Sequence, residues 1–310
     1  MALDKLKEAT GFLKRYGIED AGREAEIILV YCLGIDRTTF FRDNPGIHEE
    51  ELEKINEFLE RRSKREPLQY ILGYVDFYGL KIKVGKGVLI PRPETELLLE
   101  EAIKTVKREA LSVMRKTKTS EQALNSSLLT RYPSLLILDL CTGSGCLALA
   151  LAREFPNSQV YGTDISEVAI RYAKENAKLN CNNNVTFLKG NLFEPVEKLS
   201  TIHSSLFAFN LIVSNPPYIK RDDIKNLQPD IKDWEPLEAL DGGEDGLDYY
   251  RIIIPKARDY LKEDGHLMLE LGGSQADAVR EISKNAGFID ISLIKDYAGI
   301  ERILILKSGG

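Results

Sequence analysis

Strand-like and helix-like segments alternate along the chain from residue 135 onward, and this alternation constrains the fold more than any other feature. Short apolar runs at 135–140, 158–165 and 209–214 have the length and composition of buried strands. The stretch 167–179 between them has apolar residues at helical spacing. Because such alternation is typical of βαβ units, we predict an α/β fold with a mostly parallel sheet.

Further segments extend this pattern towards residue 310. Strands are predicted at 185–189, 265–271, 288–294 and 302–306, and helices at 247–261 and 275–286. The last two strands are joined by a tight link, which indicates that one strand of the sheet runs antiparallel. The polar, Ser/Thr-rich stretch 105–134 is predicted to be a helix end followed by a mobile surface loop.

The 310 residues suffice for two domains, with 43% hydrophobic and 29% charged residues as in ordinary globular proteins. The net charge of −6 disfavours affinity for nucleic-acid phosphates, and the chain has neither a signal core nor an uninterrupted apolar span. The cysteines form no C-x-x-C pair, so we expect no zinc and buried free thiols in a reducing cytoplasm. We therefore expect neither a membrane nor a direct nucleic-acid partner.

The tetrapeptide Asn215-Pro216-Pro217-Tyr218 directly follows the strand predicted at 209–214. Open α/β sheets bind their ligands at the carboxyl ends of strands, so this is a place where a site is expected. Successive prolines stiffen the backbone. The Asn215 side-chain oxygen and the Pro216 carbonyl could then accept hydrogen bonds from a planar NH2 group, with Tyr218 as an aromatic wall. The alternative is a rigid turn with a buried tyrosine.

The first predicted strand ends in a loop of small residues. This loop has the sequence Asp139-Leu140-Cys141-Thr142-Gly143-Ser144-Gly145. Small residues let the backbone approach a ligand, and the amides of the following helix then face it. The three-glycine dinucleotide motif is incomplete because position 141 is Cys, so the loop does not demand a pyrophosphate.

Polar residues also end the second and third predicted strands. Asp164 could accept hydrogen bonds from ribose hydroxyls, by the logic of dinucleotide-binding folds. Asn191 could contact an adenine amino edge, while Leu192 and Phe193 pack on the ring. Either polar residue alone could equally be a helix cap. In this order along the chain, followed by the tetrapeptide, they predict binding of S-adenosylmethionine (AdoMet).

The chain before the α/β region has a different pattern. Residues 1–72 carry apolar residues at helical spacing and no strand signal, so we predict a small helical bundle that recognises the substrate or only adds stability. Alternation with a glycine break at 73–84 predicts a β-hairpin within a linker at 73–92. The segment Pro91-Arg92-Pro93-Glu94 then makes a rigid entry to a helix.

Short motifs spread over nearly the whole chain resemble those of one family. They are Arg65-Glu-Pro-Leu-Gln-Tyr-Ile-Leu-Gly73, Leu89-Ile-Pro-Arg-Pro-Glu-Thr-Glu96, 139–145, Asn215-Pro-Pro-Tyr-Ile219, Glu235-Pro236 with Ala239-Leu240, 242–248, Glu270-Leu-Gly272 with Gln275, and Asp296-Tyr-Ala-Gly-Ile-Glu-Arg302. On these motifs the chain resembles the bacterial peptide chain release factor N5-glutamine methyltransferases. The Asn-Pro-Pro-Tyr motif is shared with DNA adenine and some RNA guanine methyltransferases, whereas the segment around Arg92 is more specific.

The resemblance implies methyl transfer from AdoMet to the side-chain amide of the glutamine in the Gly-Gly-Gln motif of release factors. The by-product would be S-adenosylhomocysteine, and no metal is implied. The fold implied at 93–310 is a Rossmann-like, seven-stranded methyltransferase domain with one antiparallel strand, after the helical bundle at 1–72 and the hairpin linker at 73–92. A cytoplasmic monomer is expected.

The resemblance also assigns roles to individual residues. The catalytic residues would be Asn215, Pro216 and Tyr218. The cofactor would contact Asp139, Cys141, Thr142, Gly143, Ser144, Gly145, Asp164, Asn191, Leu192 and Asn215. The substrate would contact Asn215, Pro216, Pro217, Tyr218, Arg92 and Glu94, although Arg92 and Glu94 could instead form a surface salt bridge.

The sequence departs from the family pattern at a few positions. Cys141 stands where the family usually has Gly, and Asn191 where it usually has Asp. The connection at 105–134 is longer than usual. We expect Cys141 to narrow the space near the methionine moiety, and Asn191 to keep an acceptor while losing a charge. Neither change removes the reaction.

Other functions fit parts of the pattern. A glutamine methyltransferase of a ribosomal protein is the nearest alternative, followed by a DNA adenine methyltransferase, which should carry a basic groove. A binding protein that retains AdoMet without catalysis is a different class. The complete Asn215–Tyr218 motif argues against that last class.

Overall fold

The computed structural model describes residues 1–116, 135–203 and 208–309, and the chain divides into two compact units. Unit 1 consists of Met1–Tyr74, Val84–Lys86 and Leu227–Glu235, and unit 2 of Val75–Lys83, Gly87–Asn226 and Pro236–Gly310. Of the stretch 105–134, residues up to 116 are helical, and 117–134, predicted as a loop, lie outside the described residues.

Unit 1 is the predicted helical bundle. Its helices are α1 (Ala2–Arg15), α2 (Ala21–Leu33), α3 (Arg37–Asp43), α4 (Glu49–Ser63) and the short α5 (Leu68–Leu72). Gly34 ends α2 in the left-handed conformation, and the Asp36 side chain caps α3 by accepting from the Thr39 amide. Apolar faces of these helices meet in one core that contains Leu13, Ile28, Leu29, Phe40 and Ile55, all fully buried.

A distant piece of the chain completes unit 1. The segment 227–235, which contains α10 (Pro229–Lys232), packs with the bundle rather than with the chain on either side of it. The guanidinium of the buried Arg62 donates to Asp230 Oδ2 at 2.7 Å and to Glu24 Oε1 at 3.1 Å. Arg65 Nε lies 2.6 Å from Asp230 Oδ1, an ion pair without hydrogen-bond geometry. The two pairs with Asp230 join residues more than 160 positions apart, so the local pattern that placed 227–235 with the α/β region could not reveal them.

Unit 2 begins with the predicted hairpin, of strands β1 (Tyr74–Phe77) and β2 (Leu80–Lys83), and the helix α6 (Pro93–Lys116). The seven-stranded sheet follows, in the order β5-β4-β3-β6-β7-β9-β8. Its strands are β3 (Leu136–Leu140), β4 (Gln159–Asp164), β5 (Val185–Lys189), β6 (Phe209–Ser214), β7 (Leu261–Glu270), β8 (Asp290–Lys295) and β9 (Glu301–Lys307). Strand β9 is antiparallel to both β7 and β8. The predicted mostly parallel sheet with one antiparallel strand is therefore confirmed.

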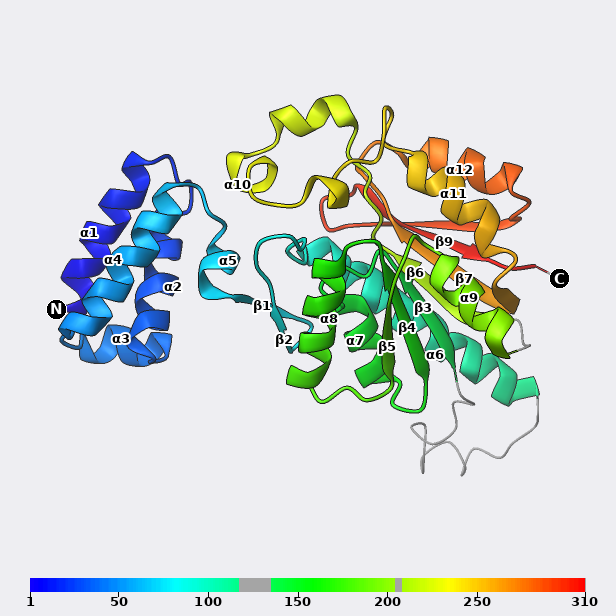
Figure 1. The fold of residues 1–310 in the computed structure, drawn as a ribbon, viewed down its shortest axis with the longest axis horizontal. Helices are drawn as coiled ribbons and strands as arrows, with labels where there is room; N and C mark the ends of the chain where they lie inside the picture. Colours follow the sequence, from blue (N-terminus) through cyan, green and yellow to red (C-terminus); the bar gives the residue numbers. More distant parts are fainter. Residues whose placement is uncertain (117–134, 204–207, 310) are drawn as a thin grey trace. The chain divides into compact units, whose positions relative to one another are not determined.

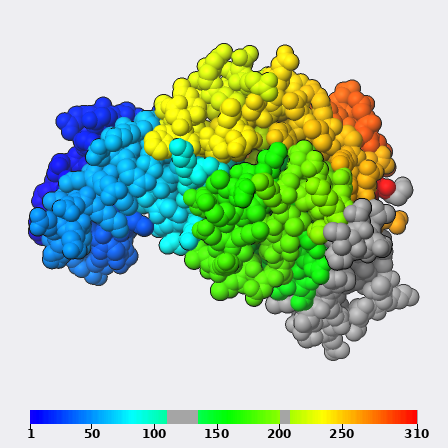
Figure 2. All heavy atoms as spheres, in the orientation of Figure 1, coloured from blue at the N-terminus to red at the C-terminus, as the bar shows by residue number. Residues whose placement is uncertain are grey.

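Helices cover both faces of this sheet (Figure 1). One layer contains α6, α7 (Cys146–Glu154) and α8 (Glu167–Leu179), and the other contains α9 (Glu194–His203), α11 (Asp248–Ala257) and α12 (Ala276–Asn285). Leu138, Ile212 and Leu267 lie in one core with Tyr250 of α11 and Val279 of α12. In the space-filling view, the green residues of β4 to α9 and the yellow-to-orange residues from 236 onward form one continuous surface (Figure 2).

The sheet order reverses between β3 and β6, and this reversal positions the site. The chain runs from β3 outward to β5 and then returns to place β6 on the other side of β3. Leu140 pairs with Ser214 at the carboxyl ends of the two strands, and the Ser214 hydroxyl donates to the Leu140 carbonyl at 2.7 Å. The glycine-containing loop and the Asn-Pro-Pro-Tyr segment thus leave the sheet side by side, at a switch point where such folds bind ligands.

The cysteines and the longest helices bear on two further expectations from the sequence. The cysteines are free, but only Cys146 is buried, while Cys181 is exposed, so the expectation that all four are buried is wrong. Cys181 follows the end of α8, where the chain turns into a surface loop with φ of 55°. Within the described ranges, no helix is both long and apolar enough to cross a membrane.

Candidate active site

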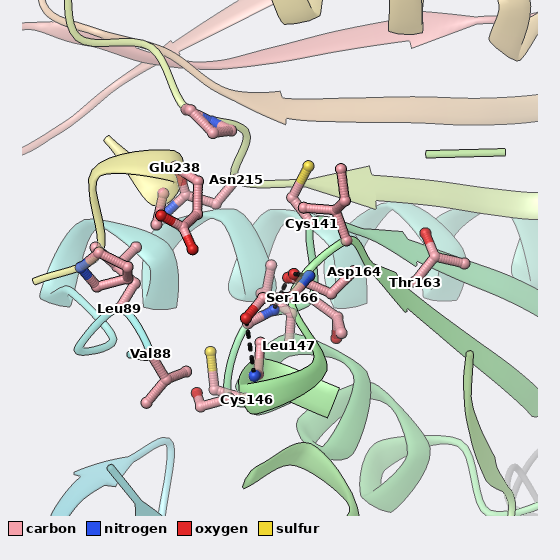
Figure 3. Close-up of a pocket in the computed structure, with 18 of the residues that line it drawn as sticks. Val88, Leu89, Cys141, Cys146, Leu147, Thr163, Asp164, Ser166, Asn215 and Glu238 are labelled. Atoms are coloured by element: carbon pink, nitrogen blue, oxygen red, sulfur yellow. Dashed lines mark hydrogen bonds between the residues drawn. The ribbon is translucent and has the colours of Figure 1, made fainter. Parts of the chain in front are cut away.

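A cavity lies in unit 2 at the carboxyl ends of β3, β4 and β6, where open α/β sheets bind their ligands. Its wall includes nine of the residues proposed from sequence. They are Cys141, Thr142, Gly143, Ser144, Asp164, Asn191, Leu192, Asn215 and Pro217. Figure 3 shows Asp164 and Ser166 towards one side of this cavity and Asn215 and Glu238 towards the other. The fold therefore brings most of the residues predicted to contact the cofactor, and two residues of the tetrapeptide, to one cavity.

The loop after β3 is held open by backbone conformation and by one buried carboxylate. Gly143 and Gly145 have positive φ, and a side chain at Gly145 would come within 2.8 Å of the Phe187 ring. Asp139 Oδ2 accepts from the Thr142 hydroxyl at 2.6 Å and from the Ala148 amide at 3.2 Å. Asp139 thus ties the loop to the first turn of α7.

Asp139 lies behind the loop rather than in the cavity wall. It is 1% exposed, and burial raises the pKa of its carboxyl to about 7. Its Oδ1 atom has no hydrogen-bond partner among the described residues. A buried charged acceptor without a partner is costly, and this cost is consistent with the raised pKa.

Asp164 faces the cavity from the end of β4. Its two oxygens accept from the backbone amides of Gly143 and Ser166, each at 2.8 Å. The cap of α8 is Ser166, which accepts from the Ala169 amide, so the alternative reading of Asp164 as that cap is not what the structure shows. Burial raises the pKa of Asp164. Each carboxylate oxygen can accept a further hydrogen bond, as ribose hydroxyls would require.

The charges around the cavity favour a cationic ligand over a phosphate. Among the residues that line it, Asp164 and Glu238 are acidic, and none is Lys or Arg. Without a basic side chain the wall lacks the usual partner of phosphate groups. AdoMet carries a sulfonium and an ammonium group, ribose hydroxyls and an adenine ring. The acidic wall, the small-residue loop and the apolar residues Val88, Leu89 and Leu147 fit those groups.

The Asn-Pro-Pro-Tyr segment is fixed from below by a buried network. Glu270, at the end of β7, is 1% exposed. Its carboxylate accepts hydrogen bonds from the Thr95 hydroxyl at 2.8 Å and from the Tyr218 hydroxyl at 3.2 Å. Asn215 Nδ2 donates to Thr95 Oγ1 at 3.1 Å. Gln275 Nε2 donates to the Tyr218 carbonyl at 2.8 Å. The parallel register of Ser214 with Leu269 places Asn215 and Glu270 at neighbouring strand ends.

The acceptors of the tetrapeptide remain available. Within the part of the chain that the structure describes, no hydrogen bond ends on Asn215 Oδ1 or on the Pro216 carbonyl. Tyr218 is half-buried, and burial next to Glu270 raises the pKa of its hydroxyl. Its ring does not line the cavity, and neither does Pro216.

The remaining predicted residues lie beside the network rather than in the cavity wall. Arg92 is half-buried and Glu94 is exposed. The positive charge of Arg92 lowers the pKa of Tyr218, and the negative charge of Glu94 raises that of Glu270. Both charges are therefore close enough to act on the buried network of Tyr218 and Glu270.

Sequence reasoning missed several contributors to this site. Thr95, Glu270 and Gln275 fall within the quoted motifs, but their roles became visible only as hydrogen bonds between separate strand and helix ends. Glu238 was not proposed at all, although it lines the cavity. The expectation that Phe193 packs on a bound ring is wrong. Phe193 is fully buried in the core of unit 2, where its ring stacks on that of Tyr260 with the centroids 4.8 Å apart.

Comparison with known proteins assigns the family. The PrmC N-terminal domain family matches residues 4–73, and a methyltransferase domain family matches residues 133–298. A release factor glutamine methyltransferase of Thermodesulfovibrio yellowstonii is 45% identical over 99% of this chain and 98% of that protein. The chain belongs to the release factor glutamine methyltransferase family. A relative of the same description from Geobacter sulfurreducens is 40% identical over 95% of this chain and 92% of that protein.

This membership makes the protein an AdoMet-dependent methyltransferase, as the motifs predicted. Among solved structures, the hMettl16 catalytic domain matches with a TM-score of 0.52 and 12% identity, over 85% of this chain and 84% of that one. That similarity concerns the fold alone. Within the described residues, no group of three or more His, Cys, Asp or Glu side chains could hold a metal ion.

Proposed function

We propose that this methyltransferase transfers a methyl group from AdoMet to the side-chain amide nitrogen of the glutamine in the Gly-Gly-Gln motif of peptide chain release factors. The family membership over the full chain supports the substrate. The observation that carries the chemistry is the orientation of Asn215 at the cavity. Its amide nitrogen is engaged by Thr95, and its oxygen is left as an acceptor beside the Pro216 carbonyl.

The cofactor would occupy the cavity at the ends of β3 and β4. Asp164 would accept the ribose hydroxyls, while Asn191 and Leu192 contact the adenine and the 141–144 loop contacts the methionine part. Gly145 and the hydrogen bonds of Asp139 to Thr142 and Ala148 would keep that loop in shape. Bound there, AdoMet supplies an electrophilic methyl group on a positively charged sulfur.

The protein's own task is to prepare a poor nucleophile. The lone pair of an amide nitrogen is delocalised into the carbonyl. Asn215 Oδ1 and the Pro216 carbonyl would accept both N–H bonds of the substrate glutamine, which localises electron density on nitrogen and fixes its direction. A well-placed polar partner of this type is worth about 2.7–4 kcal/mol in other enzymes, and positioning contributes further. Water can take the surplus proton, so we propose no metal.

Other parts of the chain would choose the substrate. We propose that Arg92, Glu94, Pro217 and Tyr218 shape the entrance for the glutamine-bearing loop. Unit 1, with its family-typical helices, would bind the release factor. We also propose that the enzyme is a cytoplasmic monomer and that it acts on a protein rather than on nucleic acid.

A methylation assay on purified release factors tests the substrate. With labelled AdoMet, the wild-type protein should methylate the glutamine of the Gly-Gly-Gln loop, as located by mass spectrometry. A release factor with Gln→Ala in that loop is the control and should stay unlabelled. Labelling of a ribosomal protein but of no release factor would contradict the proposed substrate, and labelling of DNA would contradict the class of acceptor.

The role of Asn215 has its own test. Asn215→Ala should lower kcat at least a hundredfold, about 2.7 kcal/mol, because the acceptor acts most strongly in the transition state. Affinity for AdoMet, measured by titration calorimetry, should change little, because the cofactor is held mainly by the loops after β3 and β4. A near wild-type kcat in Asn215→Ala would mean that the tetrapeptide is only a rigid turn.

A further inference from the structure

The hydrogen bonds that link Asn215, Thr95 and Glu270 all run the same way, each residue donating to the next. They run from Asn215 Nδ2 to Thr95 Oγ1 at 3.1 Å and from Thr95 Oγ1 to Glu270 Oε2 at 2.8 Å. All three side chains come from different elements: the end of β6, the first turn of α6 and the end of β7. Thr95 is 2% exposed and Glu270 1%, so bulk water does not compete for these bonds.

An ionised carboxylate can only accept hydrogen bonds. Thr95 must therefore donate its single hydroxyl proton to Glu270. Only the lone pairs of its oxygen then face Asn215. A side-chain amide facing those lone pairs must present its NH2 group. The Asn215 oxygen then points the other way, towards the substrate side. Without this constraint an amide can rotate by half a turn, because its two ends are nearly the same in shape.

We propose that Glu270, acting through Thr95, is a positioning device that sets the polarity of the Asn215 amide, so that its oxygen rather than its nitrogen meets the substrate NH2 group. The inference rests on the proposed role of Asn215 as an acceptor. A donor-facing Asn215 would repel the N–H bonds of the substrate. The relay thus decides whether the tetrapeptide can bind an amide productively.

Other bonds hold the relay in place without replacing it. The Tyr218 hydroxyl donates to Glu270 Oε1 at 3.2 Å, so the second carboxylate oxygen also has a donor. The Tyr250 hydroxyl donates to the Glu270 carbonyl at 2.8 Å and fixes the end of β7. These contacts position Glu270, but only Thr95 transmits its polarity to Asn215.

The relay depends on the ionisation of Glu270. Its pKa is raised to about 7, mainly by burial and in part by the charge of Glu94, against the lowering effect of the hydrogen bonds from Thr95 and Tyr218 and of the charge of Arg302. Other ionisable groups that act with it are the buried Tyr250 and Cys146. Above this pKa the carboxylate enforces the productive orientation. Below it the carboxyl can donate to Thr95, whose hydroxyl proton is then free to bond the Asn215 oxygen, so turnover should fall on acidification.

The decisive comparison is between Thr95→Val and Thr95→Ser in the full-length enzyme with a purified release factor. T95V removes the lone pairs that hold the Asn215 NH2 group, so kcat should fall at least tenfold while the dissociation constant of AdoMet stays within about twofold. T95S keeps the hydroxyl and should recover most of the turnover that T95V loses. Thr105→Val is the matched control, since it replaces a buried threonine ten residues further along the same helix, and it should leave kcat unchanged.

A second variant tests the relay even where T95V does not fold. In the wild type, kcat at saturating substrates should fall below an apparent pKa near 7, and Glu270→Gln, which cannot ionise, should lack that limb. An E270Q profile identical to the wild type would overturn the inference, as would wild-type kcat in a folded T95V. Asn215→Ala separates the two levels. If it stays fully active, the proposed role of Asn215 fails, whereas loss of activity there with an active T95V removes only the relay.

Discussion

Cys141 is a single residue with a strained backbone conformation at the wall of the cavity. It has φ of 56° at the start of the loop after β3, and Leu192, which also lines the cavity, has φ of 45°. A side chain in the left-handed conformation costs about 1–2 kcal/mol relative to the right-handed one. A glycine at position 141 would avoid this cost. The strained residues lie at the cavity wall, where backbone must approach a bound molecule closely.

Asp164 offers the sharpest prediction at the scale of single residues. Asp164→Ala should raise the dissociation constant of AdoMet about tenfold to a hundredfold, because it leaves ribose hydroxyls and the Gly143 amide without an acceptor, at about 1–3 kcal/mol. Titration calorimetry measures this. Asp222→Ala, which removes an acidic group from an exposed site, is the control for charge alone. An unchanged affinity in a folded Asp164→Ala would show that the carboxylate only braces the loop.

At the scale of elements, the cavity depends on close packing between β4 and its neighbours. Gly162 lies in the middle of β4, opposite Phe187 of β5. A Cβ at this position would come within 2.6 Å of the Phe187 ring and 2.9 Å of the Thr142 hydroxyl. Its φ is not in the left-handed region, so the requirement for glycine is one of space alone. The loop after β3 therefore packs closely against Phe187 of β5 and against the backbone of β4 at Gly162.

We expect Gly162→Ala to lower the free energy of unfolding by about 1–3 kcal/mol, because Phe187 and Thr142 must both shift in a packed core. Urea unfolding followed by circular dichroism provides the measurement. Gly11→Ala, at an exposed position of α1 with nothing within 4 Å of the added carbon, is the matched control. That change should be neutral or stabilising by up to about 1 kcal/mol. Equal stability of the two variants would refute the steric argument.

At the scale of the whole molecule, the chain is not divided at a single boundary. The predicted border near residue 72 is close to the end of the first piece of unit 1, but the segment 227–235 also belongs to that unit. This segment begins nine residues after Tyr218. The buried guanidinium of Arg62 is paired by Glu24 from the bundle and Asp230 from the distant segment. Its charge therefore requires both partners.

Replacing Asp230 should open this segment. Asp230→Ala leaves the buried Arg62 with one acidic partner, and we expect a loss of about 1.5–3 kcal/mol in local stability, the range for hydrogen bonds to charged groups. Hydrogen exchange and limited proteolysis of residues 227–235 report the loss directly. Asp43→Ala, which breaks the exposed Arg42–Asp43 pair, should leave stability nearly unchanged, because solvent screens this pair. If the protection of 227–235 were the same in both variants, the pairing with Arg62 would not hold the segment.

The sequence by itself determined the local features of this protein. Helical spacing, apolar runs and glycine or proline positions act over a few residues, so the helical bundle, the hairpin, the strand ends at Asp164 and Ser214, and the tetrapeptide at Asn215 could all be read from the pattern. The family motifs added the reaction. These features are local because backbone conformation and amphipathic burial depend mainly on near neighbours.

Only the tertiary structure decided which of these residues act together. Asn215 and Glu270 lie 120 and 175 positions after Thr95 in the sequence, yet the three side chains form one hydrogen-bonded chain. The docking of 227–235 onto unit 1 and the inward turn of Phe193 are of the same kind. Buried polar groups must find partners wherever the fold places them. Since that placement depends on the pairing of distant strands and helices, no local pattern contains it.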